Sequence, residues 1–125
     1  MEFTEIKSSS EAFIAGYGDG GFRMGEQRVK GSMLITPMGY YPWPVNEVSE
    51  ITIEALQPIL DCAADVELLM IGTGISMAFI SKDIRHAFAQ KDIAIEAMDT
   101  GAAARTYNVL LQEGRKVTAA LIAIK

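Results

Sequence analysis

The residues best suited to chemistry lie between positions 98 and 115. Asp99 and Thr100 stand where a helix is expected to begin, and Arg105 and Asn108 follow three residues apart on one of its faces. The positive end of such a helix, together with the Arg105 guanidinium, is suited to hold an anion or a ligand carboxylate. The structural alternative is N-capping, which the sequence favours for Asp99–Thr100 because the Asp99 carboxylate would repel an anion. For Arg105 and Asn108 both interpretations stay open.

The same helix is expected to end at Gly114, with Glu113 and Arg115 on either side of it. Glu113 is expected to pair with Arg115, or with Arg105 two turns earlier. Exposed pairs of this kind contribute about 0–1 kcal/mol. Met98 and Thr106 lie in the same segment. The polar residues of this segment predict either a recognition surface or a solvated helix face.

Gly72-Thr73-Gly74 directly follows an apolar run that reads as a buried strand. Glycines at the carboxyl end of a parallel strand lie where α/β proteins bind ligands. As a dinucleotide fingerprint the pattern fails, because Met77 stands where the third glycine belongs. A tight strand exit beside another backbone is therefore favoured over phosphate binding. The predicted cleft or recognition surface consists of Gly72, Thr73, Gly74, Met98, Asp99, Thr100, Arg105, Thr106, Asn108, Glu113 and Arg115.

The remaining reactive residue types show no spacing typical of catalysis. Cys62 is the only cysteine, and its neighbours Asp61 and Asp65 disfavour a thiolate. His86 has no second histidine with which to bind a metal, and no nucleophilic triad is apparent. The sequence predicts no catalytic residue, no metal and no cofactor.

The aromatic segment Tyr40-Tyr41-Pro42-Trp43-Pro44 is a second candidate surface. Tyrosine and tryptophan are enriched among interface hot spots, so Tyr41 and Trp43 are suited to bind a protein partner. The alternative is that the rings cover the sheet, and a lone tryptophan is more often core than interface.

Composition limits the classes of partner. The chain has 125 residues, half of them apolar, and a net charge of −5, which predicts one globular domain over residues 1–125. Its eleven basic residues are dispersed, which excludes a phosphate-tracking surface for nucleic acid and disfavours anionic lipid. No apolar run approaches the roughly 20 residues that span a bilayer, and the amino terminus does not read as a signal peptide. We expect a cytoplasmic protein without direct membrane insertion.

The pattern of turns and apolar periods predicts an α/β fold. Expected strands cover 12–17, 22–24, 29–36, 66–71, 93–97 and 116–124, whereas the proline-rich stretch 37–45 is expected to be a crossing loop. Helices are expected after Thr52 (kinked at Pro58 or beginning late), after Ser81, and over 100–113. This order predicts a mixed sheet with parallel strands under helices. The antiparallel N-terminal strands form its edge or a second small sheet.

Several of these pieces, taken in order, resemble one family over nearly the whole chain. They are Gly31-Ser32, Leu34-Ile35-Thr36-Pro37, Trp43, Ile71-Gly72-Thr73-Gly74, Met98-Asp99-Thr100, Arg105-Thr106-Tyr107-Asn108-Val109-Leu110 and Glu113-Gly114-Arg115-Lys116-Val117. The series resembles a small bacterial family of unknown function related to the mitochondrial complex I assembly factor 3. That resemblance implies a three-layer β+β/α fold and no established enzymatic activity. Since no mitochondrial targeting peptide is seen, it also implies a bacterial member.

The resemblance further implies a role by contact with other proteins. Mitochondrial relatives act in assembling the membrane-bound NADH:ubiquinone oxidoreductase, and bacterial relatives are often encoded near protein-translocation components. We therefore predict a non-catalytic accessory or assembly factor. It is expected to be cytoplasmic, or peripheral to the inner membrane through a partner. A homo-oligomer is compatible with the sequence. The alternative is an enzyme or sensor that binds a small anionic metabolite through Arg105 at the cleft where strands end and the helix begins.

Overall fold

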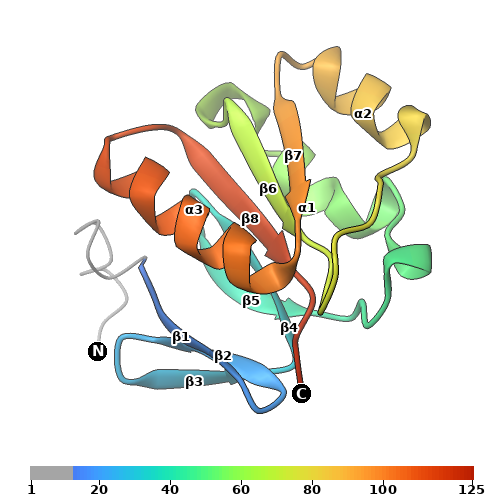
Figure 1. Ribbon diagram of the computed structural model, residues 1–125. Coiled ribbons are helices and arrows are strands. Elements are labelled where there is room, and N and C mark those ends of the chain that lie inside the picture. Colours follow the sequence, from blue (N-terminus) through green and yellow to red (C-terminus); the bar gives the residue numbers. More distant parts are fainter. Residues whose placement is uncertain (1–12) are drawn as a thin grey trace.

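The computed structural model describes residues 13–125 and divides the β-structure between two sheets (Figure 1). The first is antiparallel, with the order β1-β2-β3, and consists of β1 (Ile14–Gly18), β2 (Gly21–Met24) and β3 (Gln27–Lys30). The second is mixed, with the order β5-β4-β8-β6-β7. Its strands are β4 (Ser32–Thr36), β5 (Gly39–Trp43), β6 (Leu68–Gly72), β7 (Ala94–Met98) and β8 (Val117–Leu121). Ala12, the predicted start of the first strand, lies outside the described residues.

The five-stranded sheet is covered on both faces. Leu69 and Ile71 of β6 face a core shared with α1 (Gln57–Leu60) and α2 (Lys82–Ala89). The alternate residues Leu68 and Met70 face a second core shared with α3 (Thr100–Gln112) and the three-stranded sheet. Because β6 is buried on both faces, its sequence is a continuous apolar run. The predicted three-layer α/β fold, with parallel pairing of β6 to β7 and β8, is confirmed.

One predicted strand is in fact two. Residues 29–36 read as a single strand, but β3 ends at Lys30 and β4 begins at Ser32, in the other sheet. Gly31 between them has φ +83°, a conformation that residues with a Cβ rarely adopt. The prediction was wrong because one glycine turns the chain from one sheet into the next while apolar residues continue on both sides.

The proline-rich stretch is not a loop throughout. Residues 39–43 form β5, which pairs antiparallel with β4 and places Pro42 opposite Met33. The prediction of a crossing loop for 37–45 rested on the missing proline N–H. It was wrong because β5 is the terminal strand of its sheet, where proline is tolerated on the side without a ladder.

The helices begin near the predicted start signals, and the structure decides between the two alternatives for the first helix. Pro58 lies in the first turn of α1, so this helix begins late rather than kinks, after a short 3₁₀ turn over 54–56. Ser81 caps α2, and its Oγ accepts from the Ile84 N–H at 3.3 Å. His86 is exposed on α2, within hydrogen-bond distance of Gln90. Within residues 13–125, no helix combines the length and the apolar character needed to cross a bilayer.

Candidate functional site

The predicted cleft residues nearest the strand ends form a compact hydrogen-bonded cluster, here called the strand-end junction: Gly72, Thr73, Gly74 and Thr100. The Thr100 hydroxyl donates to the Ile122 carbonyl at 2.7 Å and accepts from the Gly74 N–H at 2.9 Å. The Thr100 N–H in turn donates to the Gly74 carbonyl at 2.8 Å. Thr100 has no exposed surface. One buried hydroxyl thereby ties the exit of β6 to the first turn of α3 and to the chain after β8.

Thr73 performs the same task for the loop that follows. Its N–H donates to the Met98 carbonyl at 2.8 Å. Its hydroxyl lies 2.7 Å from the Ser76 carbonyl and 3.0 Å from that of Met98, and accepts from the Ala78 N–H at 3.1 Å. With 7% of its surface exposed, Thr73 is a buried anchor that fixes the backbone of residues 76–78.

Gly72 is required by close approach rather than by a special backbone conformation. A Cβ at this position would lie 2.9 Å from both Thr100 Oγ1 and the Leu121 side chain, and 3.0 Å from Thr100 Cα. Gly74 has φ +101°. The expectation of a tight strand exit beside another backbone therefore agrees with the observed geometry.

Asp99 caps α3. Its Oδ1 accepts from the Ala102 N–H at 2.9 Å, which satisfies one of the amides that lack partners inside the helix. The carboxylate thus occupies the helix end that an anionic ligand would use. The predicted capping is seen, whereas the anion site with Arg105 stays a prediction.

Arg105 and Asn108 face the three-stranded sheet. Asn108 bonds to both backbone groups of Ile14: its Nδ2 donates to the carbonyl and its Oδ1 accepts from the N–H, each at 2.9 Å. The Asn108 amide thereby takes the place of a neighbouring strand beside β1. Arg105 is exposed and donates from Nη1 to the Tyr17 hydroxyl at 2.7 Å. A Cβ on Gly101 would lie only 2.7 Å from the same Tyr17 hydroxyl. The packing of α3 against β1 is therefore close at this point.

The far end of α3 pairs differently from the expectation. Arg115 Nε donates to Glu67 Oε2 rather than forming the predicted pair with Glu113. This contact lowers the pKa of Glu67 below its ordinary value and raises that of Arg115. Thr106 lies beside Met98, with its hydroxyl 3.6 Å from the Met98 sulfur. Ten of the eleven predicted positions therefore form three sets: the strand-end junction with Met98, Asp99 and Thr106, the contact to β1, and Arg115 in the ion pair at the helix exit. The eleventh, Glu113, is the exposed C-cap of α3 and belongs to none of these sets.

Residues 75–79, here called the apolar loop, were missed by the sequence interpretation. The side chains of Ile75, Met77 and Phe79 are 82%, 51% and 84% exposed. Ile80 is buried again before Ser81 caps α2. Alternation of large apolar residues after a glycine turn was the available signal, but the same alternation is typical of a half-buried strand.

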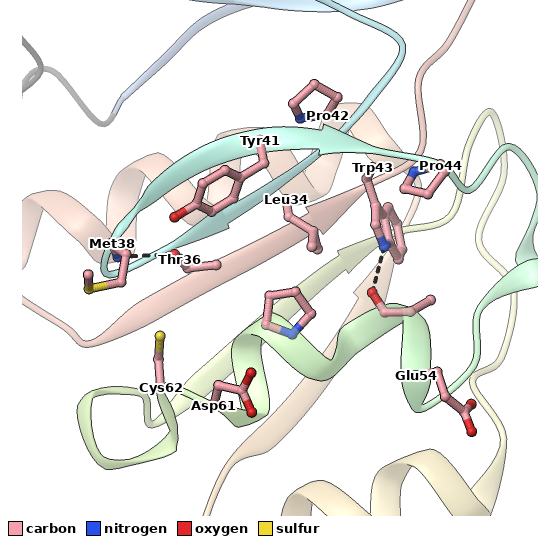
Figure 2. A pocket seen from close by; sticks show the side chains of 12 residues that line it. Leu34, Thr36, Met38, Tyr41, Pro42, Trp43, Pro44, Glu54, Asp61 and Cys62 are labelled. Carbon is pink, nitrogen blue, oxygen red and sulfur yellow. Dashed lines mark hydrogen bonds between the residues drawn. The ribbon is translucent and has the colours of Figure 1, made fainter.

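The aromatic segment lines an apolar groove of about 500 Å³ between β5 and the helical segment 54–62, here called the β5 groove (Figure 2). Trp43 is buried, and its Nε1 donates to the Ala55 carbonyl at 2.8 Å. Tyr41 is 41% exposed at the rim. Cys62 also lines the groove, and burial, with Asp61 and Asp65 nearby, raises the pKa of its thiol. Trp43 is thus a core residue that also forms a wall of the groove.

The described part of the chain holds no group of three or more His, Cys, Asp or Glu side chains placed to bind a metal. Every buried side-chain nitrogen or oxygen within residues 13–125 has a hydrogen-bond partner. Tyr107 is buried in the core beneath α3, and burial raises the pKa of its hydroxyl. The buried hydroxyls of Thr73 and Thr100 are therefore satisfied by backbone groups of the described residues.

Comparison with known proteins assigns the chain to a family. Residues 14–122 match the family described as protein of unknown function (DUF498/DUF598). The chain belongs to this family. The matched range includes the strand-end junction, α3 and the aromatic segment.

Members with curated names fall into two kinds. A Xenopus tropicalis relative, named NADH dehydrogenase [ubiquinone] 1 alpha subcomplex assembly factor 3, is 31% identical over 94% of this chain and 64% of its own length. The chain thus spans slightly less than two thirds of that relative. An uncharacterised Rhodobacter capsulatus protein is 36% identical over 87% of this chain and 82% of its own. Among solved structures, a Bartonella henselae protein described as an outer membrane protein superposes with a TM-score of 0.86 at 37% identity, covering 90% and 94% of the two chains.

Proposed function

We propose that this domain is an accessory factor that acts by contact with other proteins, and that the apolar loop is the contact. One observation carries the proposal: Ile75, Met77 and Phe79 are exposed on a loop whose backbone is held by buried hydrogen bonds of Thr73 and Thr100. Relatives named as complex I assembly factors support the accessory role. The finer expectation is assembly or insertion of a membrane complex, at or near the inner membrane through a partner.

The physical argument is one of preorganisation. Burying a large apolar side chain contributes about 1.5–3 kcal/mol, and three such side chains remain largely in water on this loop. Ordering a flexible loop on binding costs about 0.5–1.5 kcal/mol for each side chain that becomes immobilised, and about 1–2 kcal/mol for each residue whose backbone becomes fixed. Anchors at Gly74, Ser76 and Ala78 reduce the backbone part of that cost before any partner arrives. A fixed apolar protrusion fits an apolar pocket on a partner protein.

The test compares two exposed apolar sites in different parts of the fold. The double variant Ile75→Ser/Phe79→Ser removes the loop's contacts, whereas Val109→Ser removes an apolar side chain of α3 that is 52% exposed. Each tagged protein is captured from cells of its source at native abundance, and its partners are identified by mass spectrometry. The wild type and Val109→Ser are expected to recover the same defined proteins, and the loop variant to lose them.

A binding assay with the recovered partner, purified, makes the result quantitative. The expected effect of the double loop variant is a loss of affinity of at least tenfold, with unchanged folding by circular dichroism. Recovery of the same partners by the loop variant would refute the proposal. Binding of the loop to phosphatidylcholine–phosphatidylglycerol vesicles without any protein partner would refute it as well.

The metabolite hypothesis is tested in the same preparations. A ligand bound to the native state alone at a hundredfold excess over its Kd stabilises by about 2.7 kcal/mol. A thermal shift with a small anion that disappears in Arg105→Ala would favour a ligand site over a contact surface. We expect no such shift.

A further inference from the structure

The β5 groove is a second surface, and it contains no residue of the apolar loop. Its walls come from β4 and β5 on one side and from the helical segment 54–62 on the other (Figure 2). Figure 2 shows Trp43 and Leu34 beneath the strand, and Cys62 pointing toward Met38 at one end. Pro58 of the helical segment also lines the groove. With a volume of about 500 Å³, the groove is large enough to hold a few side chains.

The groove is held in shape by bonds that do not involve an occupant. The Trp43 indole is fixed to the Ala55 carbonyl at 2.8 Å, which joins the strand wall to the helical wall. At the turn before β5, the Thr36 hydroxyl accepts from the Met38 N–H at 3.0 Å. Met38 and Tyr41 remain 74% and 41% exposed at the rim. An occupant would therefore meet a preformed apolar trough with an adaptable rim.

The strand wall disfavours one mode of binding. β5 is the terminal strand of its sheet, and terminal strands commonly bind peptides by adding a further strand. Pro42, and Pro44 just beyond the strand, lack the N–H groups that such a ladder requires. Recognition in this groove must therefore rest on side chains.

The charge of the residues that line the groove indicates which side chains an occupant would carry. Glu54 and Asp61 are the charged residues among those that line the groove, both are exposed, and no basic residue lines it. The Asp61 Oδ1 accepts from Gln57, which orients the carboxylate on the helical wall. Two carboxylates on the helical wall, beside apolar lining residues, attract a cation carried next to apolar groups and repel an acidic segment.

We propose that the β5 groove binds a short linear segment of a partner protein in which one or two apolar side chains lie next to a lysine or arginine. The apolar side chains contact Trp43 of the strand wall and Pro58 of the helical wall, and the cation lies beside Glu54 and Asp61 of the helical wall. This inference rests on one part of the proposed function, namely that the domain acts by contact with other proteins. The groove and the apolar loop share no residue, so the two surfaces are separable by mutation.

The test uses the full chain and a random linear peptide display library. Selection on the wild type is expected to enrich peptides that combine apolar residues with Lys or Arg. A synthetic peptide from that selection is then titrated against the wild type, against Glu54→Gln/Asp61→Asn, and against Ile75→Ser/Phe79→Ser as control. The groove variant keeps the shape and the Asp61 acceptor position but removes both charges.

We expect the groove variant to weaken binding by about tenfold or more and the loop variant to leave it unchanged. Cys62, the only cysteine of the chain, gives an independent readout of place. Its alkylation by N-ethylmaleimide is expected to slow when the peptide is bound.

Several results would overturn the proposal. They are the absence of an enriched sequence, an acidic consensus, equal affinity in the groove variant, and an unprotected Cys62. Sedimentation that shows a concentration-dependent dimer, lost equally in the groove and loop variants, would instead identify a second copy as the occupant. Failure to capture partners through the apolar loop would refute the proposed function and leave the peptide titration unaffected.

Discussion

The strand-end junction and the apolar loop are adjacent in sequence and opposite in character. The junction buries two hydroxyls, those of Thr73 and Thr100, each bonded to backbone groups. The loop that follows Gly74 exposes Ile75, Met77 and Phe79. Polar groups are inside and apolar groups outside, which reverses the usual distribution. The difference suggests that the polar motif serves to fix the backbone from which the apolar side chains project.

The largest effect is expected from removing the hydroxyl at the centre of the junction. In Thr100→Val, the free energy of unfolding should fall by about 2–4 kcal/mol, because the Gly74 N–H and the Ile122 carbonyl each lose a partner at a cost of about 1–3 kcal/mol. Urea unfolding followed by circular dichroism measures it. Thr100→Ser keeps the hydroxyl and is the control. Equal losses in both variants would mean that packing of the methyl group, rather than the hydrogen bonds, holds the junction.

A smaller effect is expected where α3 contacts β1. Asn108→Ala should lower the free energy of unfolding by about 1–2 kcal/mol, since it removes two hydrogen bonds worth about 0.5–1.5 kcal/mol each and gains a little helix propensity. Hydrogen exchange of the Ile14 amide should become faster, because its acceptor is the Asn108 side chain. Arg105→Ala, which removes one exposed contact to Tyr17, should cost less. The reverse order would contradict a mainly structural role for Asn108.

The apolar loop should tolerate substitutions that the junction does not. Phe79→Ser should change the free energy of unfolding by no more than about 0.5 kcal/mol, as is usual for exposed positions without special contacts. A melting temperature equal to that of the wild type, together with lost partner binding, would sharpen the contrast between the two regions. A clear loss of stability would show that Phe79 packs on the fold in solution.

The smallest effect concerns the ion pair at the exit of α3. The hydrogen bond from Arg115 lowers the pKa of Glu67 from its ordinary 4.5 in the folded state. Its contribution to stability is therefore fully present above about pH 4.5 and is lost as the pH falls through the lower folded value. The slope of stability against pH in that acid range should flatten in Arg115→Gln. High salt should weaken the same contribution, because both side chains are about half exposed.

Local signals predicted much of the fold. Ser81 and Asp99 cap their helices as expected, Gly114 follows α3 with φ +82°, and the apolar run ending at Ile71 is a buried strand. These predictions succeeded because each depends on neighbours a few residues away. The split at Gly31 and the edge strand at 39–43 were missed because they depend on which sheet the chain joins and which strand is outermost.

For the candidate site, the sequence identified the right segments but not the contacts between them. It indicated that Thr73, Thr100 and Asn108 are specified positions, and the resemblance connected them into one family. It gave no means of pairing Asn108 with Ile14, 94 residues away, or Arg115 with Glu67, 48 residues away. Nor did it separate the exposed Ile75 and Phe79 from core residues of the same types.

The sequence by itself determined the fold class, the caps of the long helices and the family, because periodicity, turn residues and ordered motifs are local or collinear properties. Only the tertiary structure decided what each specified residue does. Whether a hydroxyl binds a ligand or a carbonyl depends on which backbone lies within about 3 Å of it. Whether a phenylalanine is core or surface depends on what packs over it, and both are set by elements distant in the chain.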